Sequence, residues 1–314
     1  MLLIPAVIEA PMYRRWPLWM RMPILSALVL GTVATSRSAT LAGVAPQPLD
    51  STTASRERYA DLPGVRLFSI DTSGSGIPVV FLHAGTGSSL AWEHQLEAFT
   101  AAGYRVIAPD RRGYGRSTPQ ATGPQPGNAA DDLDQLMQHL HIDRFHLVST
   151  AAGGFAAFDY AVSYPARLRS LVVANSIGGV QDEEYLELGR RIRPPQFEEL
   201  PVEFKELSPA YRAANAEGTR RWLEITRVSR QAGPPSPPQA MKNRLTFRLL
   251  ETITVPTFLL TGDADLYVPP PVLRLFADRI KHAETEVIAE AGHSSYWEQP
   301  DHFNRSVLAF LRKH

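Results

Sequence analysis

The chain has 314 residues, with 32 Lys and Arg against 32 Asp and Glu, 26 prolines and no cysteine. Without cysteine it has no disulfide, no thiol nucleophile and no thiolate metal site. A formal net charge of zero argues against nucleic-acid binding, which depends on an excess of basic side chains. The 44% of hydrophobic residues are enough for a sizeable core in one or two domains.

The N-terminal residues have the pattern of an export signal. Three arginines within residues 14–21 precede a short apolar run, residues 23–33, and small residues follow it. This order predicts a signal peptide over residues 1–40, cleaved near 36–42, and a periplasmic or secreted protein. An uncleaved membrane anchor is the alternative, although the run is shorter than the ~20 residues of a typical span. We expect a linker over residues 41–60 and no other membrane contact.

From residue 65 onward, short apolar runs alternate with amphipathic segments. Continuous apolar runs predict strands buried on both faces, as in a parallel sheet covered by helices. The strands predicted from such runs are residues 79–83, 106–108, 145–149, 170–176 and 257–261. Residues 65–71 alternate apolar and polar residues and predict a half-exposed strand. The predicted helices are residues 90–102, 129–140, 154–164, 271–280 and 302–312. This alternation predicts an α/β protein with a doubly wound sheet.

Residues 177–250 interrupt the alternation. Residues 183–191 and 219–230 have helical patterns, no buried strand is evident, and prolines cluster around them. Proline stops helices and stiffens connections. We therefore predict a helical lid with stiff hinges over residues 177–250, inserted into a core formed by residues 61–176 and 251–314. A loose surface loop is the alternative.

Polar and glycine-rich loops follow the predicted strands, where ligands bind in open parallel sheets. His83-Ala-Gly-Thr-Gly-Ser-Ser89 follows the second strand, and the turn 149–154 leads from a strand into a helix. Gly262-Asp-Ala-Asp265 follows a later strand, and His293 comes last. A carboxylate and a histidine in these places can form a general base with its orienting partner.

These motifs, in this order, resemble the α/β-hydrolase family over residues about 60–314. The resemblance implies an α/β-hydrolase fold in which Asp265 is the triad acid and His293 the triad base. It also implies an oxyanion hole formed by the backbone N–H groups of Gly85 and Ala152. Asp263 is an alternative acid because it stands two residues before Asp265.

The resemblance fails at the turn 149–154. The family's Gly-x-Ser-x-Gly-Gly pattern places Ala151 where the nucleophilic serine belongs. A methyl group cannot attack a carbonyl, so neither the acyl-enzyme route nor a carboxylate nucleophile is available at this position. Ser149 and Thr150 remain as alternative nucleophiles.

What remains is an Asp265–His293 dyad facing an oxyanion hole. This set is compatible with hydrolysis of an ester or lactone by a water that His293 activates. It is also compatible with proton abstraction while the hole holds an enolate-like anion. The leading hypothesis is an enzyme of one of these kinds acting on a small carbonyl substrate. The alternative is a non-catalytic binding or sensor protein on the same fold.

The other polar residues near these loops have structural interpretations. His83 belongs to the predicted oxyanion loop, and Asp110 and Arg111 brace the loop after the next strand. No residue spacing indicates a metal site, and no phosphate-binding Gly-x-x-x-x-Gly-Lys is present. We therefore expect no cofactor and no metal, and a small-molecule substrate as the partner.

Overall fold

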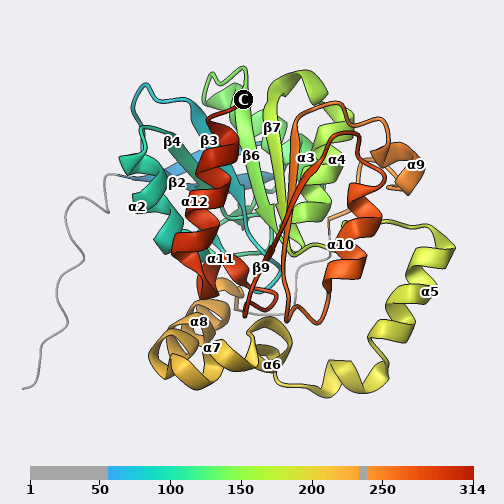
Figure 1. Ribbon diagram of the computed structural model, residues 1–314. Coiled ribbons are helices and arrows are strands. Elements are labelled where there is room, and N and C mark those ends of the chain that lie inside the picture. Colours follow the sequence, from blue (N-terminus) through green and yellow to red (C-terminus); the bar gives the residue numbers. More distant parts are fainter. Residues whose placement is uncertain (1–55, 233–238) are drawn as a thin grey trace, which may run out of the picture. The chain divides into compact units, whose positions relative to one another are not determined.

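The computed structural model describes residues 56–232 and 239–314 (Figure 1). All described residues belong to one compact unit of the chain, the second of two. The predicted signal peptide, residues 1–40, lies outside the described residues.

A nine-stranded sheet forms the centre of this second unit. Its strands are β1 (Glu57–Leu62), β2 (Val65–Asp71), β3 (Pro78–Leu82), β4 (Arg105–Pro109), β5 (Thr118–Pro119), β6 (Phe145–Thr150), β7 (Leu168–Ala174), β8 (Thr257–Gly262) and β9 (Glu284–Ile288). The strand order is β1-β2-β4-β3-β6-β7-β8-β9, with β5 beside β2. Strands β4 to β9 of this path are parallel, whereas β2 pairs antiparallel with its neighbours. The sheet therefore has the mostly parallel, doubly wound form that the sequence predicts.

Helices cover both faces of the sheet. The helices of the core are η1 (Ser89–Trp92), α2 (Glu93–Ala101), α3 (Ala129–His139), α4 (Gly153–Ser163), η2 (Pro165–Arg167), α9 (Phe247–Leu250), α10 (Pro270–Ala277), α11 (Ser295–Glu298) and α12 (Pro300–Leu311). Figure 1 shows α2 and α12 on one face and α3, α4 and α10 on the other.

Each face has its own apolar cluster, and the alternation along the strands separates the two. In β3, Val79 and Phe81 pack with α2 and α12, whereas Val80 and Leu82 pack with α3 and α4. Successive side chains of a strand point to opposite faces. A strand buried on both faces therefore has a continuous apolar sequence, which explains why these strands are evident in the sequence.

The strands at the edges are less evident. β1 begins at Glu57, inside the linker expected over residues 41–60, and its side chains alternate between exposed and buried. β9, at the opposite edge, buries Ile288 but exposes three of its other residues. An edge strand needs fewer apolar residues than a central one, so its sequence lacks the continuous run that marked the others.

The helices that follow β7 and precede α9 are called here the inserted helices. They are α5 (Glu183–Ile192), η3 (Pro195–Glu199), α6 (Val202–Glu206), α7 (Pro209–Ala214) and α8 (Ala216–Ser229). Pro195 and Pro209 occupy the first position of their helices, where the missing N–H costs nothing. Trp222 and Ile225 of α8 are buried in the cluster that contains α2 and α12, and Figure 1 shows α6, α7 and α8 beneath the sheet.

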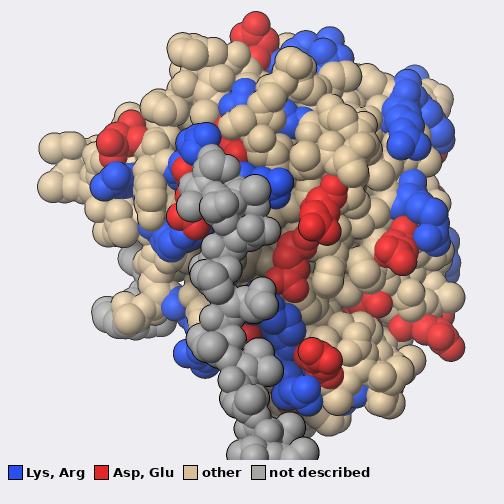
Figure 2. All heavy atoms as spheres, turned by 90° about the vertical axis from the view of Figure 1, so that its left-hand side faces the viewer, with Lys and Arg blue, Asp and Glu red and all other residues tan. Residues whose placement is uncertain are grey.

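The surface carries both signs of charge in close proximity. On the face shown in Figure 2, Lys and Arg side chains are interspersed with Asp and Glu. The described surface also carries ion pairs such as Arg116–Glu57 and Arg221–Glu93. Among the described residues, no helix combines the length and apolar character needed to cross a membrane.

Candidate active site

Ala151 occupies a strained turn between β6 and α4. Its φ angle is 48°, in the left-handed region that favours glycine. The carbonyl of Ala151 accepts hydrogen bonds from Ser176 Oγ at 2.6 Å and from the N–H of Gly154 at 3.0 Å. Its own N–H donates to the carbonyl of Ala174 at 3.0 Å. These bonds on both sides hold the conformation, which for alanine costs about 1–2 kcal/mol.

The two glycines after this turn allow α4 to begin against the ends of neighbouring strands. A Cβ atom on Gly153 would overlap the carbonyl oxygen of Leu82, and one on Gly154 would overlap Ser176 Oγ. Glycine is therefore required at both positions by close contact. This packing places the N–H of Ala152, just before α4, at the carboxyl end of the sheet, where a helix start leaves N–H groups unpaired.

His293 and Asp265 form a buried pair. The loop after β8 carries Asp265 and the loop after β9 carries His293, and parallel strands bring these loops to the same edge. Nδ1 of His293 lies 2.9 Å from both carboxylate oxygens of Asp265. The structure therefore brings together the two residues that the sequence predicted as acid and base. Asp263, the alternative acid, is exposed instead.

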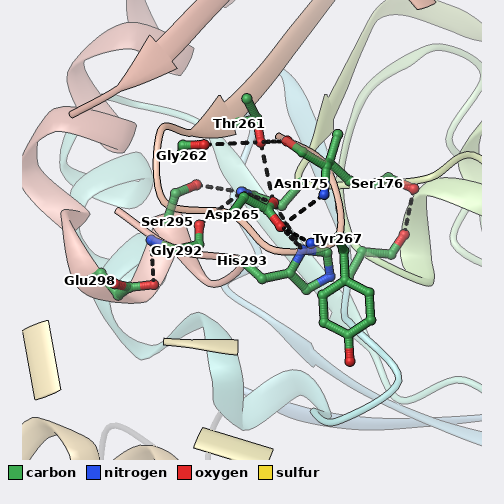
Figure 3. Close-up of polar contacts among 12 residues, drawn as sticks. Asn175, Ser176, Thr261, Gly262, Asp265, Tyr267, Gly292, His293, Ser295 and Glu298 are labelled. Atoms are coloured by element: carbon green, nitrogen blue, oxygen red, sulfur yellow. Dashed lines mark hydrogen bonds and ion pairs between the residues drawn. The ribbon is translucent and has the colours of Figure 1, made fainter. Parts of the chain in front are cut away.

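A network of donors fixes the Asp265 carboxylate (Figure 3). Oδ1 accepts the N–H groups of Tyr267 at 2.7 Å and Val268 at 2.9 Å. Oδ2 accepts from Asn175 Nδ2 at 2.9 Å and Thr261 Oγ1 at 3.2 Å. Donors to both oxygens favour the ionised carboxylate and fix its orientation toward His293.

The negative charge of Asp265 and a positive charge on His293 stabilise each other. Burial raises the pKa of Asp265, but His293 and the hydrogen-bond donors outweigh burial and hold this pKa below its usual value. Burial lowers the pKa of His293, but the carboxylates of Asp265 and Glu206 outweigh it and raise this pKa. Because Asp265 is ionised, Nδ1 of His293 carries the proton, and in neutral histidine Nε2 is left as the acceptor.

A cavity of about 170 Å³ opens at this pair. Its lining residues are Gly85, Thr86, Ala151, Ala152, Phe155, Ile177, Glu206, Tyr267 and His293. A methyl group added to Gly85 would lie 3.6 Å from Cβ of Ala152, so these two residues are neighbours. The hydrogen bonds between described backbone groups use neither the N–H of Gly85 nor that of Ala152. Both predicted oxyanion donors thus lie in one cavity with His293 and Ala151.

The alternative nucleophiles lie outside this cavity. Ser149 is buried in β6, and its Oγ donates to the carbonyl of Val172 at 3.0 Å within the sheet. Thr150 is also fully buried, and its hydroxyl has no hydrogen-bond partner among the described residues. Neither side chain lines the cavity. The described cavity therefore has no serine hydroxyl beside His293.

The neighbouring loops brace the site as the sequence indicated. Nδ1 of His83 lies 2.7 Å from the carbonyl of Ala84, and Nε2 of His83 accepts the N–H of Arg111. The Asp110 carboxylate accepts the N–H groups of Ser89 and Arg116. In residues 56–232 and 239–314, no group of three or more His, Cys, Asp or Glu residues is placed to hold a metal ion.

The sequence did not identify two polar residues of the cavity. The ring of Tyr267 lies against that of His293, with centroids 4.2 Å apart, and its proximity to Asp265 in the chain was the only available signal. Glu206 comes from α6, far from His293 in sequence. No local pattern signals a contact that depends on how the inserted helices pack against the core.

Glu298 joins the inserted helices to the histidine loop. Its Oε2 accepts the N–H of Ser208 at 2.8 Å, and its Oε1 accepts the N–H of Gly292 at 3.0 Å. The N–H of Ser294 donates to the carbonyl of Glu206 at 2.9 Å. The segment between α6 and α7 is therefore connected to both neighbours of His293, directly to Ser294 and through the Glu298 carboxylate to Gly292.

Known proteins resemble this chain over most of its length. A family model of the alpha/beta hydrolase family matches residues 79–305. A 2-hydroxy-6-oxononadienedioate/2-hydroxy-6-oxononatrienedioate hydrolase of Burkholderia vietnamiensis is 28% identical over 278 residues, which cover 79% of this chain and 92% of that protein. A non-heme chloroperoxidase of Kitasatospora aureofaciens is 32% identical over 275 residues, which cover 80% and 97%.

A solved structure has a similar fold. A thermophilic esterase from Thermogutta terrifontis matches with a TM-score of 0.66 and 26% sequence identity, covering 82% of this chain and 98% of that one. The matches to the family model and to this structure confirm the fold predicted from the sequence motifs.

Proposed function

Because the chain belongs to the alpha/beta hydrolase family, we propose that it hydrolyses a small ester or lactone with a water molecule as the nucleophile. One observation carries the proposal. His293, the methyl group of Ala151 and the backbone of Gly85 and Ala152 line the same small cavity. In this proposal His293 is the base and Gly85 and Ala152 supply the oxyanion donors, while a methyl group stands at the position that the family pattern gives to serine.

The reaction follows from the orientation of His293. With its Nδ1–H held by Asp265, neutral His293 presents Nε2 to a water above Ala151. The water oxygen attacks the carbonyl carbon and its proton passes to Nε2. The carbonyl oxygen becomes an oxyanion that the N–H groups of Gly85 and Ala152 stabilise, each by about 2.7–4 kcal/mol in comparable sites. Collapse of this intermediate breaks the carbon–oxygen bond, the leaving alkoxide takes up a proton to become the alcohol, and the carboxylic acid is released with His293 neutral again.

The size of the cavity supports a small substrate. A volume of about 170 Å³ is below the ~300–1,000 Å³ of drug-sized ligand sites. Phe155 and Ile177 supply apolar walls, so a short acyl group or a small lactone ring suits the space.

We test the proposal with wild type, His293→Ala and Ala151→Ser on short aryl and alkyl esters and a lactone. His293→Ala should lower kcat/KM by about 10²–10⁴-fold, the usual contribution of a general base. His139→Ala is the matched control, because His139 is exposed on α3 and its loss should leave kcat/KM unchanged.

Labelling with a fluorophosphonate separates water attack from covalent catalysis. The reagent should label Ala151→Ser, which gains a hydroxyl in the cavity, and leave wild type unlabelled. A labelled wild type would reveal a substitute serine and refute the proposal. A wild type inert on every substrate, together with a labelled and active Ala151→Ser, would identify a non-catalytic binding protein.

A further inference from the structure

Glu206 places a second carboxyl group in the cavity. It is the last residue of α6, its exposure is only 6%, and it lines the cavity with Ala151 and His293. Its Oε2 is buried without a hydrogen-bond partner among the described residues. Buried carboxyl groups are normally hydrogen-bonded, so an unpartnered one in a cavity needs an explanation.

Glu298, a second buried carboxyl group near the histidine loop, has the hydrogen bonds expected of a structural residue. Glu298 is buried to the same extent, with 6% exposure, and each of its oxygens accepts a backbone N–H. Those bonds account for its presence by joining Ser208 to Gly292. Glu206 Oε2 has no such bond, and the Glu206 residue lines the space where substrate would bind.

The backbone of Glu206 is fixed relative to His293. Its carbonyl accepts the N–H of Ser294, the residue after His293. A Cβ atom on Gly292 would lie 2.6 Å from the backbone nitrogen of Ser208, so the two chain segments are in direct contact. The backbone of Glu206 is therefore fixed to the histidine loop by the fold, and its side chain lines the cavity that His293 also lines.

The surroundings of Glu206 favour its protonated form. Burial raises the pKa of Glu206, the charge of His293 opposes this increase, and the charge of Asp265 adds to it. Lys205 also opposes the increase, and the net pKa lies above the usual value. A carboxylic acid that keeps its proton to higher pH is suited to donate it to a departing oxygen.

We propose that Glu206 is the general acid of the hydrolysis, donating its proton to the leaving alkoxide while His293 acts as the base. This assignment rests on the proposed ester or lactone hydrolysis. As the carbon–oxygen bond of the tetrahedral intermediate breaks, the leaving oxygen takes the bond's electron pair and the proton of Glu206. The products are a carboxylic acid and an alcohol. Exchange with solvent water then removes the proton of His293 and supplies one to Glu206, which restores both groups.

The dependence on the leaving group tests this assignment. A nitrophenolate departs without protonation, whereas an alkoxide needs a proton. Glu206→Gln should therefore lower kcat for alkyl esters and lactones by about 10²-fold or more, and change kcat for nitrophenyl esters by less than about threefold. KM should change little for either class. Glu199→Gln, an exposed site in the preceding helix, is the matched control and should change neither.

Two further measurements separate catalysis from folding. Because Oε2 of Glu206 lacks a partner, Glu206→Gln should unfold at a temperature equal to or above that of wild type. Glu206→Asp keeps an acidic proton and should restore part of the alkyl-ester activity. If Glu206→Gln unfolds at a lower temperature than wild type, Glu206→Asp decides the question. A loss of kcat in Glu206→Asp that is the same for alkyl esters and nitrophenyl esters would overturn the assignment.

The outcomes distinguish this inference from the proposed function. Equal losses on both ester classes with a raised KM would make Glu206 a binding group and overturn the assignment. Unchanged activity of Glu206→Gln on alkyl esters would also overturn it, while leaving the proposed hydrolysis intact. A wild type that hydrolyses no ester or lactone would refute the proposed function itself, and the assignment with it.

Discussion

Several hydrogen bonds fix the carboxylate of Asp265, and this carboxylate in turn influences His293. Each of its oxygens accepts two donors besides His293, so the carboxylate has little freedom to turn. Its charge raises the pKa of His293 against the effect of burial. The same carboxylate therefore sets both the orientation of the histidine and the pH at which the histidine becomes a base.

Replacement of Asp265 should change the pH dependence in a defined direction. In Asp265→Asn the negative charge is lost, so the pKa of His293 falls and its neutral, basic form persists to lower pH. The rising limb of kcat/KM against pH should move to lower pH. The maximal rate should fall by up to about 10⁴-fold, because the amide no longer enforces the correct tautomer.

Asp263→Asn is the control for that variant. Asp263 is exposed two residues away, so its loss should change neither the rate nor the pH profile. An unshifted limb in Asp265→Asn, or an equal loss of rate in Asp263→Asn, would contradict the role given to Asp265.

At the residue scale, sequence motifs identified those residues of the candidate site that follow directly after a strand. Asp265, His293, Gly85 and Ala152 follow strands within a few residues, and a parallel sheet brings such positions together. Glu206 has no such relation to a strand. Its place in the cavity depends on contacts of α6 with the histidine loop, which no local pattern in the sequence encodes.

At the scale of elements, the inserted helices are not uniform. No described residue of α5 is buried, whereas α8 buries Trp222 and Ile225 in the core. The segment between α6 and α7 is fixed to the histidine loop by Glu298 and by the backbone of Glu206. If the predicted lid opens, the movement therefore belongs to α5 and not to the segment before α7.

Removal of Glu298 should weaken this connection. Glu298→Ala leaves the N–H groups of Ser208 and Gly292 without their acceptor, and each buried unpaired group costs about 1–3 kcal/mol. The free energy of unfolding should fall by about 2–6 kcal/mol for the two groups together. Hydrogen exchange at these two amides should become faster than in wild type.

Glu97→Ala provides the comparison. Glu97 is exposed on α2, so its loss should change the free energy of unfolding by less than about 0.5 kcal/mol. If Glu298→Ala has unchanged stability and its two amides stay protected, the connection between α6 and the histidine loop is not what holds this segment.

For the whole molecule, the sequence predicted the central sheet better than its borders. Continuous apolar runs identify β3, β4, β6, β7 and β8, because strands buried on both faces need them. The edge strands β1 and β9 carry exposed polar residues and were not identified by their sequence. The inserted helices were predicted in part, since α6 and α7 are too short for a clear helical period.

Export is the prediction that concerns the whole chain. In a Gram-negative host, intact-mass analysis of the periplasmic fraction should find a chain that has lost the predicted signal, with cleavage near residues 36–42. Leu28→Arg places a charge in the apolar run and should block export. Ala45→Arg, in the predicted linker, should not. Full-length wild type retained in the cytoplasm would contradict the prediction.

The bonds that Glu298 makes also limit how this protein can be recombined with its relatives. Exchanging the inserted helices between homologues is an obvious way to build chimeras of altered selectivity. Here the segment before α7 ends in hydrogen bonds to residues on either side of His293. A transplanted segment that does not bring a backbone N–H group to the position of Ser208 would leave one oxygen of Glu298 unpaired and disturb the loop that carries His293. The inserted helices and the C-terminal loop are therefore best exchanged together, as one unit.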